Sequence, residues 1–336
     1  MSKLTIKTDY KSSLSVYDTQ TAIGILKRSF EEQLSDSLNL KRVSAPLIVE
    51  PITGMNDDLN GIERPVEFDI MEEPCKRIQI VHSLAKWKRM ALYKYGFSVG
   101  EGIYTDMNAI RRDEEMDNIH SVYVDQWDWE KIISKKDRRE GYLLETVKKI
   151  VDTICKTSEK IKGIYPKLKV SLSNNVSFIT TQELEDMYPN MTPKEREIEY
   201  LKQHKTAFIM QIGGKLKSGI KHDGRAPDYD DWSLNGDIIF WNDVLETAFE
   251  ISSMGIRVDK NSLDSQLIEA NCDDRRALTF HKMLLADQLP LTMGGGIGQS
   301  RLCMLLLEKL HIGEVQASIW DEKTVSGCMD AGIVLL

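Results

Sequence analysis

Hydrophobic side chains recur every three or four residues in two long stretches of this chain, a spacing that places them on one face of an α-helix. The first helix is expected to start at Asp18 or Thr19, whose side chains can cap it, and to run to about Leu38. The second is expected over 139–162. The apolar faces comprise Ile23, Leu26, Phe30 and Leu34 in the first helix and Leu143, Val147, Ile150, Val151 and Ile154 in the second.

Shorter apolar runs elsewhere are typical of strands. A run from Leu40 would end at Pro46, because proline cannot donate to the hydrogen-bond ladder of a sheet. The runs 102–111 and 120–129 flank a charged loop, which predicts a hairpin with a long tip. Further strands are expected at 207–212, 237–241 and 249–258.

Helices are also expected among these strands. One begins at Ser83 and another at Thr192-Pro193, since proline suits the first helical position. The C-terminal half adds two more, 273–287 and 297–310. Regular strand–helix–strand crossovers are missing, and the hairpin favours antiparallel pairing. We therefore expect an α+β fold, a large, mostly antiparallel sheet flanked by helices, in a single domain over residues 1–336.

Composition narrows the classes of function. A net charge of −8 disfavours a protein that coats tRNA or DNA. The five cysteines include no C-x-x-C pair, so neither a disulfide framework nor a zinc site is expected, and a reducing compartment fits. The N-terminus lacks an apolar signal region, and no apolar run reaches membrane-spanning length. We expect a cytoplasmic protein without nucleic-acid or membrane partners.

The strongest local signal is a glycine-rich segment, GGGIGQSR at residues 294–301. Glycines let the backbone approach a flat ring or a phosphate closely, and Arg301 on the first turn of the following helix can hold phosphate oxygens. Gln299 breaks the dinucleotide-binding pattern, and no P-loop motif is present. Taken alone, the segment is equally compatible with a glycine-rich turn that carries a surface arginine.

A second candidate lies at the tip of the expected hairpin. Arg111 ends the first strand and could pair with an α-phosphate, while Glu114 in the loop could accept a hydrogen bond from an adenine amino group. Without further context, a solvated loop tip explains the same residues.

Acidic side chains gather in two aromatic-rich segments, 125–128 and 228–232. Carboxylates there are costly to bury without a partner, such as a cationic substrate group or a metal, although surface turns would also explain them. Asp237 and Glu250, on adjacent expected strands, could share a Mg2+ that bridges phosphates, since carboxylates suit this hard cation. Asp243 competes with Asp237 for that role.

The order of these segments resembles the three signature motifs of class II aminoacyl-tRNA synthetases, especially the aspartyl and asparaginyl group. A helix with a proline-ended strand is followed by an arginine-bearing hairpin and then by the glycine-rich segment. Four stretches look more closely like the ammonia-dependent asparagine synthetases, or aspartate–ammonia ligases, and the resemblance spans nearly the whole chain. They are HSLAKWK at 82–88, HSVYVDQWDW at 120–129, RAPDYDDW at 225–232 and GGGIGQSR at 294–301.

This resemblance implies a catalytic domain that forms a homodimer, with the first helix and the strand ending at Pro46 at its interface. It implies that L-aspartate and ATP form β-aspartyl-AMP and pyrophosphate, and that ammonia then displaces AMP to give L-asparagine. ATP is then a substrate, Mg2+ a cofactor, and asparagine biosynthesis the role.

The resemblance also implies nucleotide contacts. Arg111 would lie at the α-phosphate and Arg301 at the polyphosphate tail, while Mg2+ would bind Glu250 with Asp237. Charge that develops at phosphorus in the transition state needs such neutralisation. The implied ATP-binding residues are Arg111, Glu114, Asp237, Glu250, Gly296, Gly298 and Arg301.

Opposed charges would orient the amino-acid substrate so that its β-carboxylate faces ATP. The implied contacts are Gln126, Asp128 and Asp230 to the ammonium, Lys88 and Arg257 to the other carboxylate, and hydrogen bonds from Ser83 and Ser252. Either Asp57 or the adjacent Asp58 would attract ammonium and accept its proton. The implied catalytic residues are Asp57, Lys88, Arg111 and Arg301.

Two other functions compete with the ligase. An aspartyl- or asparaginyl-tRNA synthetase is disfavoured, because the chain begins almost at the first motif without room for an anticodon-binding domain and is acidic. A silent module that binds aspartate or AMP is disfavoured because the implied catalytic residues are all retained. Free ammonia is the expected nitrogen donor, since the chain starts Met1-Ser2 without the catalytic cysteine of a glutamine-hydrolysing domain.

Overall fold

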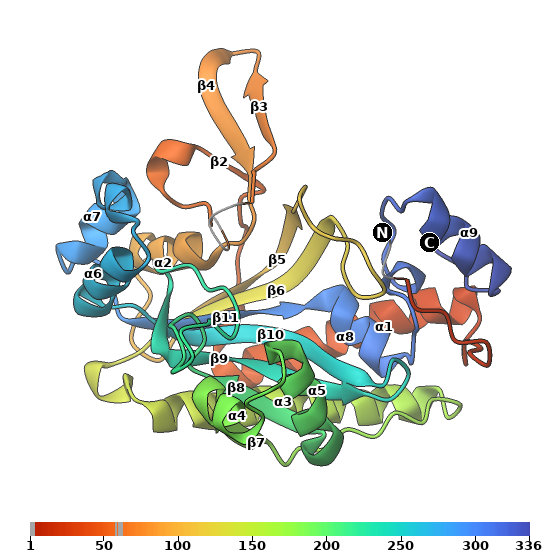
Figure 1. Ribbon diagram of the computed structural model, residues 1–336. Coiled ribbons are helices and arrows are strands. Elements are labelled where there is room, and N and C mark those ends of the chain that lie inside the picture. Colours follow the sequence, from red (N-terminus) through yellow and green to blue (C-terminus); the bar gives the residue numbers. More distant parts are fainter. Residues whose placement is uncertain (1–3, 58, 60–62) are drawn as a thin grey trace.

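A computed structural model describes residues 4–57, 59 and 63–336. At its centre is an eight-stranded sheet in which most neighbouring strands run antiparallel, while the two edge pairs are parallel (Figure 1). The expected α+β fold is therefore confirmed. The strands, in their order across the sheet, are β1 (Leu40–Arg42), β5 (Gly102–Ile110), β6 (Tyr123–Ile132), β11 (Thr292–Gly298), β10 (Thr247–Arg257), β9 (Asp230–Asn242), β8 (Thr206–Met210) and β7 (Ser177–Thr180).

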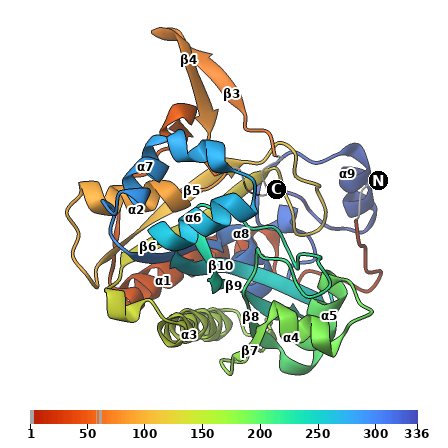
Figure 2. The ribbon, with the colours of Figure 1, turned by 60° about the vertical axis from the view of Figure 1, so that its left-hand side comes forward.

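The two long helices predicted from the apolar spacing lie together on one face of this sheet (Figure 2). Both α1 (Val16–Leu38) and α3 (Glu140–Ile164) bury the expected apolar faces in the largest hydrophobic core of the described residues. The rings of Phe30 on α1 and Trp127 on β6 meet there, with centroids 4.6 Å apart. This packing leaves the opposite face of the central strands available for polar side chains.

A buried arginine fixes α2 (Ala85–Lys94) on that opposite face (Figure 1). Nη1 and Nε of Arg89 donate hydrogen bonds to the carbonyls of Val258 and Pro290, at 2.7 and 2.8 Å. Burial lowers the pKa of Arg89 to about 10, which leaves the side chain charged at neutral pH. The helix is thereby held by its own side chain over the ends of β10 and β11.

Helix boundaries depart from the predictions where capping or local chain geometry decides them. α1 begins before Asp18, because Oγ of Ser15 accepts the hydrogen bond from the amide of that residue. The single helix predicted over 273–287 is wrong, since the extended residue Leu278 separates two shorter helices. The remaining helices are α4 (Thr181–Met187), α5 (Pro193–His204, starting as predicted), α6 (Lys260–Glu269), η3 (Asp273–Ala277), α7 (Thr279–Leu285), α8 (Gln299–Leu306), η4 (Ile312–Glu314) and α9 (Glu322–Asp330).

Several strand boundaries also differ. The strand from Leu40 stops at Arg42, before Pro46, and β9 begins at Asp230, so part of the acidic segment lies within the sheet. The glycine-rich segment forms β11 and is followed by α8, which shortens the helix predicted at 297–310. Glycine has a low strand propensity, so this strand has no periodic signal of its own.

A small three-stranded sheet that the sequence did not predict projects from the body of the molecule (Figure 1). Its strands lie in the order β2, β4, β3. In the described part of the chain, no helix has both the length and the apolar character needed to cross a membrane. The bounds are β2 (Ile48–Val49), β3 (Glu67–Ile70) and β4 (Glu73–Ile80), with the turn η1 (Pro51–Thr53) between β2 and β3 and the turn η2 (Lys135–Asp137) before α3.

Candidate active site

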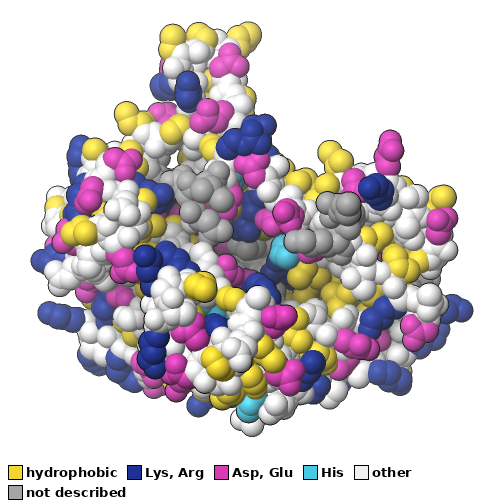
Figure 3. Space-filling model, in the orientation of Figure 1, with side chains coloured by type: hydrophobic (Ala, Val, Ile, Leu, Met, Phe, Trp, Pro, Cys, Tyr) yellow, Lys and Arg dark blue, Asp and Glu magenta, His cyan; other side chains and the backbone are white. Residues whose placement is uncertain are grey.

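A cavity of about 360 Å3 opens on the polar face of the central strands. Residues of β6, β11, β10 and β9 line its floor, while Trp127, Ile238 and Ile297 on the same strands belong to the core under α1 and α3. The molecular surface is hollowed between the projecting sheet and the side that carries α9 (Figure 3). A cavity of this size suits a small molecule or nucleotide.

Most of the residues predicted for a site meet in this cavity. Three of them, Asp57, Lys88 and Ser252, do not line it, and Asp58 lies outside the described residues. The lining includes the predicted residues Ser83, Arg111, Glu114, Gln126, Asp128, Asp230, Asp237, Glu250, Arg257, Gly296, Gly298 and Arg301.

Two arginines from distant parts of the chain border one end of the cavity. Arg111 follows directly after β5, and its Nη2 donates to the carbonyl of His82 at 3.5 Å. Arg301 lies in the first turn of α8, where its Nη1 donates to the carbonyl of Glu250 at 3.1 Å and lies 3.6 Å from the carboxylate of the same residue. Glu114 lines the cavity beside them, since its amide closes a turn onto the carbonyl of Arg111. Both guanidinium groups line the cavity at this end.

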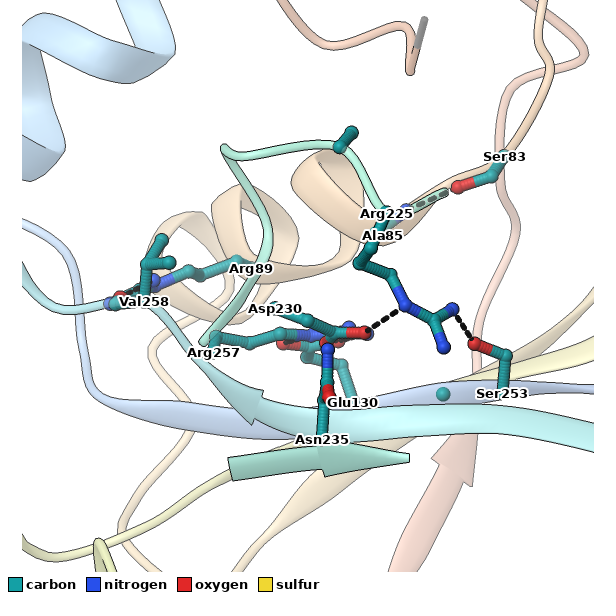
Figure 4. A network of polar contacts seen from close by, with 12 residues as sticks. Ser83, Ala85, Arg89, Glu130, Arg225, Asp230, Asn235, Ser253, Arg257 and Val258 are labelled. Carbon is teal, nitrogen blue, oxygen red and sulfur yellow. Dashed lines mark hydrogen bonds and ion pairs between the residues drawn. The ribbon is translucent and has the colours of Figure 1, made fainter. Parts of the chain in front are cut away.

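Asp237 and Glu250 reach the same end from β9 and β10, as the sequence predicted. Nη2 of Arg225 pairs with Oδ1 of Asp237 at 2.6 Å and Nη1 donates to Ser253 (Figure 4). Burial raises the pKa of Asp237 to about 7, with Arg225 opposing the rise and Glu250 adding to it. A divalent cation would relieve the repulsion between the carboxylates of Asp237 and Glu250. Such a pair suits Mg2+, which commonly takes its other ligands from water and phosphate.

The wider surroundings limit what metal this pair could hold. In the described segments, no group of three or more His, Cys, Asp or Glu side chains is arranged to bind a metal ion. Asp243 is exposed in the turn after β9 and does not line the cavity, so its competition with Asp237 is not supported. Among the described residues, Asp237 and Glu250 are thus the two carboxylates expected to hold the metal here, and the oxygens of a bound phosphate would complete its coordination.

The other end of the cavity is an ion-pair network on the sheet floor (Figure 4). Arg257 at the end of β10 pairs with Glu130 at 2.8 Å and with Asp230. Lys88 from α2 is buried beside the cavity, 3.1 Å from Oδ2 of Asp128 and 3.0 Å from the carbonyl of Gly295. Lys88 therefore holds a cavity-lining carboxylate and does not itself line the cavity.

The charges of this network leave room for a cation. Four carboxylates (Asp128, Glu130, Asp230, Asp237) are linked by ion pairs to three cations (Lys88, Arg225, Arg257), which gives 3 − 4 = −1 when all of them are ionised. Burial would raise the pKa of Glu130, but Arg257 and Lys88 hold it below its usual value, so Glu130 is ionised at neutral pH. A substrate ammonium group beside Asp128 and Asp230 would balance the charge.

Two glycines of β11, Gly294 and Gly296, make room for the polar side chains of this network. A Cβ on Gly294 would lie 2.0 Å from Oε2 of Glu130, and one on Gly296 would lie 2.5 Å from Oε1 of Gln126. Gly298 is the residue before α8 and lines the cavity beside Arg301. Strand β11 therefore has glycines because polar side chains of β6 cross over it.

Ser252 is buried in the core side of β10, and its hydroxyl has no hydrogen-bond partner. The register between β9 and β10 shifts between Glu250 and Ser252, which reverses the alternation of side chains beyond that point. Ser253 lines the cavity in its place. The predicted substrate contact at Ser252 is therefore not supported by its position, which is buried away from the cavity.

Asp57 lies beside the cavity in a second buried cluster. Its Oδ2 accepts a hydrogen bond from Ser83, which lines the cavity, and its Oδ1 lies 3.5 Å from Nζ of Lys86. Nζ of Lys86 is also 3.1 Å from Oδ2 of Asp228. Burial raises the pKa of Asp57, and the charge of Lys86 opposes that rise.

Sequence reasoning missed several members of these networks. Glu130 follows Gln126 and Asp128 at a spacing of two, so the strand period alone would have placed it on the same face. Lys86 and Asp228 lie within stretches that carried the family resemblance, but no local pattern indicated that they meet. Arg225 likewise lacked a signal, because its partner Asp237 is in another segment.

Comparison with solved structures identifies the class of fold. Asparaginyl-tRNA synthetase of Pyrococcus horikoshii in complex with asparaginyl-adenylate aligns with a TM-score of 0.64 and 14% identity, covering 90% of this chain and 68% of that chain. Aspartyl-tRNA synthetase of Entamoeba histolytica aligns with a TM-score of 0.58 and 16% identity, covering 89% and 58%. The catalytic core thus has the fold of class II aminoacyl-tRNA synthetases.

Within that class the family is specific. Residues 17–332 match the family described as aspartate-ammonia ligase. Aspartate–ammonia ligases of Ruminiclostridium cellulolyticum and Clostridium tetani are 60% and 58% identical, covering 97% and 99% of this chain and 97% and 98% of their own lengths. That of Fusobacterium nucleatum is 60% identical over 97% of this chain and 99% of its own. The chain belongs to the aspartate–ammonia ligase family.

Proposed function

We propose that this cavity carries out the ATP-dependent amidation of L-aspartate with ammonia, through β-aspartyl-AMP, with release of AMP and pyrophosphate. One observation carries the proposal. The cavity of a member of this family is lined by Arg111 and Arg301 and, on the same sheet floor, by the carboxylates of Asp128 and Asp230. The product would be L-asparagine for biosynthesis.

At the first end, Arg111 would neutralise the α-phosphate and Arg301 the polyphosphate tail. Glu114 would accept from the adenine amino group, and Gly298 would face the nucleotide beside Arg301, whereas Gly296, predicted to bind ATP, lies against Gln126 and Asp128 at the other end. Hydrogen-bond donors fixed before the reaction are effective here, because little reorganisation is needed as charge moves. Mg2+, held by Asp237 and Glu250, would supply further neutralisation of the phosphate charge.

At the other end, Asp128, Asp230 and Gln126 would hold the substrate ammonium, and Arg257 would hold the carboxylate that does not react. Ser83 would add a hydrogen bond from the opposite wall. Lys88 would act through Asp128, which it fixes, rather than by touching the substrate. The two ends together would leave the β-carboxylate directed at the α-phosphate.

In the second half-reaction, Asp57 would take a proton from ammonium so that neutral ammonia can attack the acyl carbon. Its support is the hydrogen bond to Ser83, which places the carboxylate beside the cavity wall. Replacement Asp57→Asn would then spare aspartate-dependent pyrophosphate exchange and lower asparagine formation by about a hundredfold, a usual effect of losing a general base. Equal loss of both activities would rule out this role.

The enzyme is further proposed to work as a homodimer through α1, in the cytoplasm. All five cysteines are free thiols, which suits a reducing compartment.

Product analysis tests the function directly. Purified protein is incubated with aspartate, ammonium chloride and MgATP, and the products are separated by chromatography. Asparagine, AMP and pyrophosphate are expected in equal amounts, and Arg301→Gln should reduce all three together. Formation of ADP and phosphate would contradict the adenylate route, whereas binding of ATP and aspartate without turnover would indicate a silent module.

A further inference from the structure

A buried cluster of charged groups lies behind Asp57, apart from the cavity lining. Asp228 is its centre: its Oδ2 is 3.1 Å from Nζ of Lys86, 2.9 Å from Nη1 of Arg275 and 2.9 Å from Nε2 of His281. Asp228 and His281 are fully buried, and Lys86 is 2% exposed. Neither the substrate pocket nor the phosphate end uses these groups.

This cluster joins segments that are remote in the sequence. Lys86 belongs to α2, Arg275 to η3 and His281 to α7, while Asp228 precedes β9. Burying such charges is costly unless they are paired. Burial would raise the pKa of Asp228, but Lys86, His281 and Arg275 hold it far below its usual value. Asp228 is therefore a fixed anion that anchors Lys86.

Lys86 in turn faces Asp57, which connects the cluster to the wall of the cavity through Ser83. The ionisable groups that act on the Asp57 carboxylate are Lys86, Asp228 and Arg257, and Tyr229 lies close enough to feel its charge. Oδ1 of Asp57 accepts no hydrogen bond and is 3.5 Å from Nζ of Lys86. A fully buried carboxylate with one oxygen lacking a hydrogen bond depends on this ion pair to stay charged.

We propose that Lys86 is a positioning residue for amide formation: anchored by Asp228, it holds the carboxylate of Asp57 ionised and ready to accept a proton from ammonium. The inference rests on the proposed role of Asp57. In the step it supports, one N–H proton of ammonium passes to the carboxylate. The nitrogen lone pair then forms the C–N bond, the C–O bond to AMP breaks, and AMP leaves with the electron pair while the amide nitrogen releases its second proton to water.

The consequence for pH has a definite sign. Burial raises the pKa of Asp57 and Lys86 opposes the rise, so removal of Lys86 raises that pKa further. The carboxylate would then ionise only at higher pH. The rising limb of ammonia-dependent activity should move to higher pH, whereas the adenylation step, which does not use Asp57 as a base, should keep its profile.

The test compares Lys86→Met with Lys309→Met, which removes another buried lysine that does not line the cavity. In Lys86→Met, pyrophosphate exchange should stay within about threefold of wild type, while asparagine formation falls by about thirtyfold or more, within the range of lost base catalysis. The midpoint of the rising pH limb should increase by about one unit. Lys309→Met should lower both activities equally or neither.

Hydroxylamine provides the sharpest readout, because it is largely uncharged at neutral pH and needs no base before it attacks. Hydroxamate formation by Lys86→Met should remain near the wild-type rate, and Lys86→Arg should restore part of the ammonia-dependent rate. If hydroxylamine and ammonia rates fall together, Lys86 is only structural and the proposal is wrong.

Two further variants keep the role of Lys86 testable and separate it from the proposed role of Asp57. If Lys86→Met does not fold, Lys86→Gln, which removes the charge and keeps a polar side chain, should show the same split between the two nucleophiles, and its absence would overturn the proposal. If Asp57→Asn fails to separate the half-reactions, the role of Asp57 is wrong. If Asp57→Asn separates them but Lys86→Met does not, only the role of Lys86 is wrong.

Discussion

A methyl group added at Gly296 should weaken the binding of aspartate and leave the binding of ATP almost unchanged. A Cβ there would lie 2.5 Å from Oε1 of Gln126 and 2.8 Å from Oδ1 of Asp128, so both side chains must move. We expect Gly296→Ala to raise the KM for aspartate about tenfold, a loss of about 1.4 kcal/mol, with less than about threefold change for ATP. Steady-state kinetics with each substrate varied in turn will measure this.

The matched control is Gly163→Ala in the last turn of α3, where a Cβ would meet nothing within 4 Å. That variant should gain up to about 1 kcal/mol of stability and keep both KM values. Equal increases in the two KM values for Gly296→Ala would contradict the assignment of Gln126 and Asp128 to the amino acid.

Individual residues also show how far the sequence could predict the site. The alternation along β6 gave Gln126 and Asp128 correctly on one face, because that period belongs to the strand itself. The prediction for Ser252 was not supported, because a shift of register in β10 reverses which side chains face the cavity, and the sequence carries no sign of that shift. Lys86 received no role, because its partners come from other segments that only the folded chain brings together.

At the scale of elements, the short helix η4 should make stability depend on pH. His311 caps it: Nδ1 accepts a hydrogen bond from the amide of Gly313 at 3.0 Å and must be unprotonated to do so. Burial lowers the pKa of His311 from 6.5 to about 4. The unfolded chain therefore binds a proton that the folded chain excludes, and stability is lost as pH falls from 6.5 towards 4.

We expect the His311 contribution to cost on the order of 2 kcal/mol between pH 7 and pH 4.5. In His311→Asn the amide oxygen can still accept the capping hydrogen bond, so this part of the pH dependence should vanish. Urea unfolding at the two pH values measures the difference, and His204→Asn on the exposed end of α5 is the control. If His311→Asn loses as much stability between the two pH values as the wild type does, the His311 cap is not the source of the pH dependence.

Elements differ in how well the sequence predicts them, for a physical reason. Amphipathic helices such as α1 and α3 can be predicted from the sequence, because one face must be apolar along many turns. Strand β11 does not, because its glycines are dictated by side chains that cross it from β6. The projecting sheet of β2, β3 and β4 was missed, because its residues are largely exposed and lack an apolar alternation.

At the scale of the whole molecule, the expected homodimer interface can be tested on an open groove along α1 and β5. The groove combines one cation with several acids, so two copies related by a twofold axis could pair the cation of each with an acid of the other. Glu31 links it to the site, because its carboxylate accepts the indole N–H of Trp127 at 2.9 Å, between Gln126 and Asp128. The groove residues are Arg28, Glu31, Glu32, Ser35, Asp36 and Tyr104.

Arg28→Glu would make every charged side chain of the groove acidic, so two copies would repel one another there. For Arg28→Glu we expect sedimentation equilibrium to show a dissociation constant of the dimer at least about tenfold higher than that of the wild type. Its specific activity should fall on dilution, because dissociation exposes the groove that lies next to Trp127. Lys202→Glu, on the exposed face of α5, makes the same charge change elsewhere and should sediment like the wild type.

A wild-type chain that sediments as a monomer at assay concentration would contradict the dimer. A variant that dissociates with full activity would instead show that the groove mediates assembly without supporting the site, because the hydrogen bond between Glu31 and Trp127 would then hold in a single copy.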